Sequence, residues 1–232
     1  MKVKLLRYTA DAELLCGTAA STSTKSGSPS EMFEKMDLET AKRLIKRVTG
    51  YGHSSVVEHA SFTFSIEGVS RVMTHQLVRH RVASYTQQSQ RYVTYDTVEK
   101  YVTPPSIANN AEAKRTFDKT LEQISETYKK LIGMRIPKED ARFILPNASK
   151  TNIIVTMNAR ELLHFFNLRC CARAQWEIRE VAVEMLRQAK KVAPALFGNA
   201  GPSCVELGYC PEGKMKPAEC GVEEVKKWFR SL

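Results

Sequence analysis

The run VRHRVASYTQQSQRY, at residues 78–92, is the most distinctive stretch of the chain. Within the thirteen residues 79–91 it holds three arginines, one histidine, two serines and three glutamines, and no acid. Arginine is permanently charged and its planar guanidinium matches paired phosphate or carboxylate oxygens, while serine and glutamine add uncharged donors. The run therefore predicts a site for an anionic ligand, although a solvated basic loop, or arginines neutralised by carboxylates elsewhere, would have the same composition.

A short helix is predicted directly before this run, over residues 70–78. Ser70 suits its N-cap, and the residues that follow supply an apolar side. On such a helix Arg71, His75 and Arg79 share one face, because residues four apart are neighbours on a helix surface. The helix would deliver the basic run at its C-terminal end.

Periodicity elsewhere predicts a mixture of strands and helices. Strands are expected at residues 2–7, 61–66, 92–101 and 152–157. Helices are expected at residues 10–20, 37–48, 110–132 and 158–169, with others starting at 137 and 174. The polar stretch at 21–30 reads as a loop.

The whole chain has 232 residues and 43% hydrophobic content, enough for one large domain or two small ones. It contains no apolar run of membrane-spanning length and no signal-peptide pattern at its start, so a cytoplasmic location is expected. The net charge of +10 raises nucleic acid as a partner. The basic residues form no long block and no finger or helix-turn-helix signature is present, so a small phosphate-bearing ligand is favoured and a nucleic-acid or nucleotide-binding module is the alternative.

No metal site is predicted. Cys204, Cys210 and Cys220 are separated by five and nine residues and lack the close cysteine pair typical of zinc sites, so a zinc site is the less favoured interpretation. Six cysteines in a chain without an export signal are expected to be reduced thiols. The chain has neither a Walker loop nor the glycine-rich motif of a Rossmann site.

Several blocks together resemble the flavin-dependent thymidylate synthases. Arg79-His80-Arg81, then seven residues, then Ser89, resembles the signature of that family. The blocks GHSSVVEH at 52–59, FTF at 62–64, NAR at 158–160, NLR at 167–169 and AQWE at 174–177 follow the family's order. One departure is Gln87, which stands where many relatives carry a glutamate and so replaces a negative charge by an amide.

The resemblance implies a fold of the α/β (α+β) class, with an antiparallel sheet flanked by long helices. It implies a single domain over residues 1–232, with a cysteine-containing tail from about residue 200. It further implies a homotetramer with active sites at subunit interfaces, which methylates dUMP reductively to dTMP. Methylenetetrahydrofolate would be the carbon donor, NADPH the reductant and FAD the hydride carrier.

The resemblance also assigns residues by position. The positions that match FAD contacts are His53, Ser55, Arg79, His80, Arg81, Gln87, Asn158, Ala159, Arg160 and His164. The positions that match dUMP contacts are Gln76, Leu77, Val78, Arg79, Gln87, Gln88, Ser89, Gln90, Arg91, Arg142 and Arg169.

Arg169 is the candidate catalytic residue. Methylation at C5 of uracil requires electron density at that carbon, and a guanidinium against the pyrimidine edge can stabilise charge on N3 and the neighbouring oxygen. Ser89 lacks a histidine and acid pair to deprotonate it, so it is expected to contact dUMP and not to act as a nucleophile. A flavoprotein oxidoreductase with another substrate is a second enzyme alternative.

Overall fold

The computed structural model describes residues 1–95, 97–218 and 220–232, and its contacts divide the chain into two compact units. Unit 1 comprises Met1–Lys2, Ile66–Arg79 and Thr86–Ile153. Unit 2 comprises Val3–Ser65, His80–Tyr85 and Ile154–Leu232. Each unit is therefore built from three separated segments, and the basic run contributes residues to both. A single domain over residues 1–232 stays a prediction.

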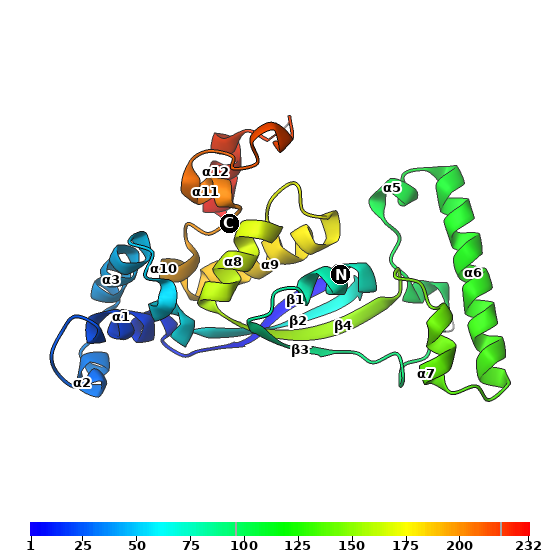
Figure 1. Cartoon of the computed structure of the whole chain (residues 1–232), viewed down its shortest axis with the longest axis horizontal. Helices are drawn as coiled ribbons and strands as arrows, with labels where there is room; N and C mark the ends of the chain where they lie inside the picture. The colour runs from blue at the N-terminus through cyan, green and yellow to red at the C-terminus, as the bar shows by residue number, and fades with distance from the viewer. Residues whose placement is uncertain (96, 219) are drawn as a thin grey trace. The chain divides into compact units, whose positions relative to one another are not determined.

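A four-stranded antiparallel sheet has the order β1-β2-β4-β3 (Figure 1). Its strands are β1 (Lys2–Tyr8), β2 (Ser61–Ser70), β3 (Ala83–Gln87) and β4 (Lys150–Asn158). In β2 the side chains of Phe62, Phe64 and Ile66 are fully buried, because alternate residues of a strand face the same side. The expected antiparallel α/β fold is confirmed.

Unit 2 holds the helices that flank the strands on one face, α8 (Ala159–Arg169) and α9 (Trp176–Val192) (Figure 1). Its first helices, α1 (Ala12–Thr22) and α3 (Leu38–Gly50), pack closely: a Cβ on Gly17 would lie 2.6 Å from that of Ala41. The remaining elements are α2 (Pro29–Glu34), η1 (Ser54–His59), α10 (Pro194–Phe197), α11 (Ser203–Leu207), η4 (Gly213–Met215) and α12 (Val222–Ser231).

Unit 1 is built around α6 (Ala111–Gly133), whose N-cap Asn110 accepts hydrogen bonds from two backbone amides. Its buried core contains Tyr95, Tyr128 and Ala141. The other elements are α4 (Arg71–Leu77), η2 (Val98–Lys100), α5 (Pro105–Ala108), α7 (Lys138–Ala141) and η3 (Arg142–Ile144). No helix in the described part of the chain, α6 included, combines the length and apolarity needed to cross a membrane.

The strand expected at residues 92–101 is wrong for the residues described there, while residue 96 lies outside them. They form turns and η2, with a single bridge between Tyr101 and Ser149. The aromatic content that suggested a strand serves the unit 1 core instead: Tyr95 is buried and donates a hydrogen bond to the carbonyl of Lys150 at 2.6 Å. The fourth strand is β3, which lies inside the basic run.

The tail beyond residue 200 is packed into unit 2 by α12. Phe229 is buried, and a Cβ on Gly201 would approach its ring to 3.0 Å. The buried ammonium of Lys190 donates a hydrogen bond to the carbonyl of Phe229. Since an unpaired buried charge is costly, this bond ties α12 to α9.

Candidate functional site

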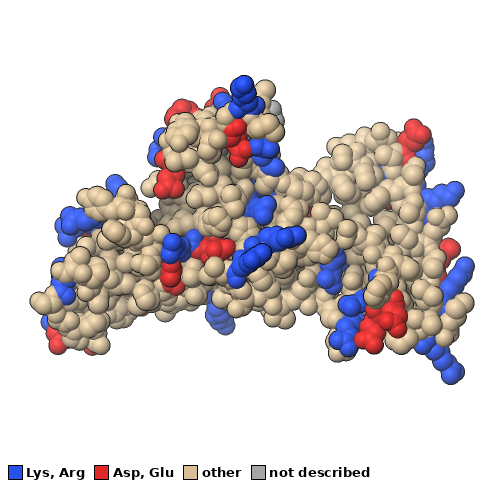
Figure 2. All heavy atoms as spheres, in the orientation of Figure 1, with Lys and Arg blue, Asp and Glu red and all other residues tan. Residues whose placement is uncertain are grey.

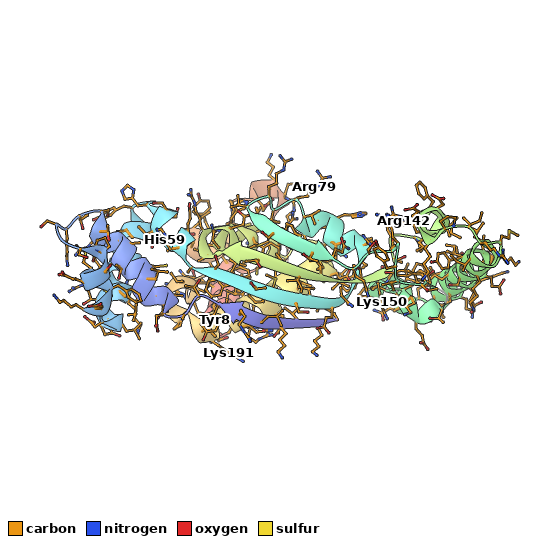
Figure 3. All side chains as sticks on the ribbon, turned by 90° about the horizontal axis from the view of Figure 1, so that it is seen from below. Tyr8, His59, Arg79, Arg142, Lys150 and Lys191 are labelled. Atoms are coloured by element: carbon orange, nitrogen blue, oxygen red, sulfur yellow. The ribbon has the colours of Figure 1, made fainter. Side chains whose placement is uncertain are left out.

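Helix α4 presents the start of the basic run. Ser70 caps it, since its hydroxyl oxygen accepts a hydrogen bond from the amide of Met73 at 3.1 Å, as the sequence predicts. Beyond its end, Arg79 and Arg81 are exposed, and within the described residues neither guanidinium has a hydrogen-bond or ion-pair partner. Figure 3 shows Arg79 at the outer edge of the ribbon. Two free cations therefore flank His80.

His80 belongs to unit 2 and is buried, only 4% exposed. Its Nε2 accepts a hydrogen bond from Nε of Arg169 at 3.1 Å, and its Nδ1 lies 3.3 Å from Oε1 of Glu161. The hydroxyl of Tyr85 donates to its backbone carbonyl at 2.7 Å, and the ring meets Phe165 edge-on at 4.9 Å. Contacts from α8 and β3 therefore hold the residue in place, and α8 supplies the neighbours of both ring nitrogens.

Helix α8 is positioned to do this by its cap and its periodicity. The side chain of Asn158 accepts a hydrogen bond from the amide of Glu161 at 2.9 Å, which confirms the predicted start of the helix. Glu161, Phe165 and Arg169 then recur every four residues and so share one face. That face is the one in contact with His80.

The protonation of this group follows from its burial. Desolvation, with the neighbouring charges of Arg169 and His164, lowers the pKa of His80 to about 4, so the ring is neutral at physiological pH. Burial raises the pKa of Glu161 and lowers that of Arg169. Burial and the nearby Glu161 raise the pKa of Tyr85, which keeps its hydroxyl protonated as a donor.

The other positions matched to FAD also lie mainly in unit 2. His53, Ser55 and His164 are exposed, whereas Ala159 is buried. The exposed guanidinium of Arg160 forms an ion pair with Glu58. Only Arg79 and Gln87 of that set belong to unit 1.

The positions matched to dUMP lie in unit 1, except for Arg169. Arg91 forms an exposed ion pair with Glu139 at 3.1 Å, and Nε of Arg142 donates to the backbone carbonyl of Glu139 at 3.1 Å. Over α6 and α7, Figure 2 shows acidic side chains beside basic ones.

Arg71, which the motif comparison left out, belongs with this unit 1 group. Its Nη2 donates to the carbonyl of Gln88 at 3.1 Å, while its buried Nε has no hydrogen-bond partner among the described residues. Burial and the nearby Arg142 lower its pKa. The four-residue spacing of Arg71, His75 and Arg79 in the sequence was the signal that could have found it.

The middle of the run is held by internal hydrogen bonds. Nε2 of Gln87 donates to the hydroxyls of Thr74 at 2.9 Å and Thr151 at 3.3 Å. The hydroxyl oxygen of Ser89 accepts from the amide of Arg91 at 3.2 Å. The segment from Gln87 to Arg91 is therefore fixed locally, and the side chain of Gln87 is engaged within unit 1. Of the remaining matched positions, Leu77 is buried, Gln76 is half-buried and Val78 is exposed; Gln88 and Gln90 are half-buried.

Two of the six cysteines, Cys16 and Cys170, are buried. All six are free thiols. Burial raises the pKa of Cys16 to about 12 and also raises that of Cys170, which adjoins Arg169. Among the described residues, no three or more histidines, cysteines or acids are grouped so as to hold a metal ion.

Comparisons with known proteins agree on one family. The family model described as "Thymidylate synthase complementing protein" matches residues 4–195. A flavin-dependent thymidylate synthase of Geobacter sulfurreducens is 50% identical over 235 residues, covering 100% of this chain and 99% of the relative. One from Pyrococcus furiosus is 51% identical over 205 residues, covering 85% of this chain and 84% of the relative.

A solved structure agrees in fold. The flavin-dependent thymidylate synthase of Helicobacter pylori, complexed with FAD and dUMP, superposes with a TM-score of 0.70 and 26% identity, covering 87% of this chain and 100% of that one. The family match, the near full-length identity and the shared fold lead to one conclusion: the chain belongs to the flavin-dependent thymidylate synthase family.

Proposed function

We propose that this enzyme converts dUMP to dTMP by reductive methylation, with methylenetetrahydrofolate as carbon donor and NADPH as reductant, through FAD. The observation that carries the proposal is the state of Arg169. Its guanidinium is half-buried and held by a neutral histidine, and no carboxylate of the described residues forms a direct ion pair that would cancel its charge. Such a cation is suited to stabilise charge that develops on a ligand.

The unit 1 group fits the phosphate of dUMP. Arg142 lies close enough to Arg71 for its charge to lower the pKa of Arg71, in addition to the effect of burial. Two like charges held close together favour the binding of an anion beside them. Ser89 and the half-buried glutamines around it add neutral donors for the sugar and base. Arg79, Arg91 and Arg142 would hold the phosphate.

The exposed donors of unit 2 fit FAD, whose diphosphate needs cations. Arg81 is exposed without a partner among the described residues, and Arg160 has only an exposed ion pair to lose. An exposed pair of that kind is worth little, so exchange for a phosphate is inexpensive. His53, Ser55 and His164 would add polar contacts. When bound, FAD would carry the hydride that NADPH supplies.

The chain's own contribution to the chemistry is electrostatic. Arg169 would stabilise negative charge at N3 of the pyrimidine and the oxygen beside it, which raises electron density at C5. Cys170 is the nearest thiol in the sequence, but it is buried and its pKa is raised, so it is a poor nucleophile. The proposed reaction therefore uses no covalent bond from Cys170 to dUMP.

We also infer the assembly and location of the enzyme. A homotetramer, in which subunits complete one another's active sites, is the arrangement implied by the motifs that the chain shares with its family. We place the enzyme in the cytoplasm. Size-exclusion chromatography with light scattering tests the first inference.

The deciding experiment starts with a visible absorption spectrum of the purified protein. NADPH is then added without oxygen, followed by dUMP and methylenetetrahydrofolate, and dTMP is quantified. We expect a flavin band that bleaches and then recovers while dTMP forms. A colourless protein that takes up no added FAD, or a flavoprotein whose reoxidation ignores dUMP, would overturn the proposal.

A further inference from the structure

His80 lies between an acid and a base on the same helix face. Its two ring nitrogens are 3.3 Å from Oε1 of Glu161 and 3.1 Å from Nε of Arg169. The ring is buried, while the side chain of Glu161 is 12% exposed. Glu161, His80 and Arg169 thus form one continuous polar chain inside unit 2, although His80 and Arg169 are 89 positions apart in the sequence.

The donor at one end fixes the tautomer of the ring. Arginine has only donors, so the Nε2 that receives the Arg169 bond must be the unprotonated nitrogen. A neutral imidazole then carries its single proton on Nδ1, which faces Glu161. Oε1 of Glu161, 3.3 Å from Nδ1, is placed to favour this tautomer over the other.

The groups around the ring agree with that assignment. The elements packed against His80 present Glu161, His164 and Arg169 from α8, and Tyr85 from β3. Arg169 disfavours a second proton on the ring, and Tyr85 donates to its backbone and leaves both nitrogens to α8. A protonated ring would offer a donor where Arg169 also has a donor, and the contact would be lost.

We propose that His80 is a positioning residue for Arg169, and that Glu161 fixes the tautomer that makes this possible. The bond engages only Nε, so the two terminal nitrogens of the guanidinium stay available for a ligand. A long side chain at the end of a helix would otherwise sample many rotamers. The inference rests on the proposed function insofar as the ligand of Arg169 is the pyrimidine of dUMP.

The test compares His80→Phe with His80→Gln. Phenylalanine fills the space but offers no acceptor, whereas the glutamine oxygen can reach the place of Nε2. We expect H80F to lower kcat for dTMP about 100-fold, the scale of a small misplacement of a catalytic group. We expect H80Q to recover at least about a tenth of the wild-type rate. FAD content and melting temperature are measured for both.

A second pair keeps the imidazole and changes its neighbour. Glu161→Leu removes the acceptor for Nδ1–H, so the ring can turn its donor towards Arg169, and we expect about a 10-fold loss of kcat. Glu161→Gln retains an acceptor and should lose less. This pair decides the matter if H80F does not fold. His59→Gln, at an exposed position, is the matched control.

A readout independent of turnover is the ring itself. In the ¹⁵N-histidine NMR spectrum of the wild type, we expect one neutral histidine with its proton on Nδ1, and in E161L the same signal shifts to the other tautomer. An Nε2-protonated His80 in the wild type would overturn the inference.

The two failures are distinguishable. If the wild type makes no dTMP, the proposed function fails, while the tautomer of His80 still tests the contact with Arg169. If the wild type makes dTMP and H80F turns over at the same rate, or H80Q is as slow as H80F, the positioning role fails alone.

Discussion

The two units hold their cations in opposite ways. In unit 2 protein contacts hold Arg169: the buried ring of His80 lies between Arg169 and Glu161. In unit 1 Arg71 keeps a buried Nε without a partner among the described residues, and Arg142 donates only to a backbone carbonyl. An arginine fixed by protein contacts can act on a transition state, whereas incompletely satisfied arginines bind an anion. We therefore expect the unit 2 group to affect the rate and the unit 1 arginines to affect the affinity for dUMP.

The largest effect is expected at Arg169. Arg169→Ala removes the charge that stabilises the pyrimidine, so we expect kcat/KM for dUMP to fall about 1,000-fold. FAD content should stay close to that of the wild type, because Arg169 is not among the positions matched to FAD. Steady-state dTMP formation and the flavin absorbance measure both. A variant that keeps a tenth of the activity would remove Arg169 from the catalytic role.

In unit 1 the expected effect is on affinity. Arg142→Ala removes a charge-assisted contact worth about 1.5–3 kcal/mol, so KM for dUMP should rise about 10–100-fold while kcat changes little. Arg115→Ala, on the exposed side of α6, is the matched control. A fall in kcat without a change in KM would erase the proposed contrast between the units.

The pH dependence of stability should distinguish the buried histidine. An unfolded histidine protonates near its ordinary pKa of 6.5, whereas folded His80 does so only at about 4. Between these values the unfolded state binds more protons, so His80 makes stability rise with pH, and that contribution is lost as pH falls from 6.5 to 4. Urea melts of the wild type and H80F at pH 5 and pH 7 measure it. Equal pH slopes would show that His80 titrates normally.

The smallest effects concern a matched pair of helix caps, Asn158 on α8 and Asn110 on α6. Replacing either by alanine should cost about 1 kcal/mol of stability, because backbone amides lose their acceptor. Only N158A should also slow turnover, since α8 carries Glu161 and Arg169. Thermal melts and dTMP assays of both variants test this. Equal turnover in the two variants would show that the Asn158 cap is not needed to position Glu161 and Arg169.

The sequence predicts the helix starts well, because capping is local chemistry. Asp37, Ser70 and Asn158 each accept the expected backbone hydrogen bond. Strand β3 was missed because its residues, ASYTQ, carry no apolar alternation and are only half-buried or exposed. The false strand at 92–101 arose from aromatic residues that pack in the core of unit 1.

The motifs name the residues of the candidate site but not the contacts between them. The shared motifs identified His80 and Arg169 separately, yet nothing local connects two residues 89 positions apart. Glu161 has a local signal, the Asn158-x-x-Glu161 capping pattern, but its contact with the ring depends on tertiary packing. Whether the matched residues bind FAD and dUMP stays a prediction.

The bond from Lys190 to Phe229 bears on how the protein can be engineered. The family match ends at residue 195, which invites truncation there. A shortened chain would lose α12, leave a buried ammonium without its carbonyl and uncover the surface that Phe229 occupies against Gly201. Affinity tags and fusions are therefore better joined beyond α12 than substituted for it.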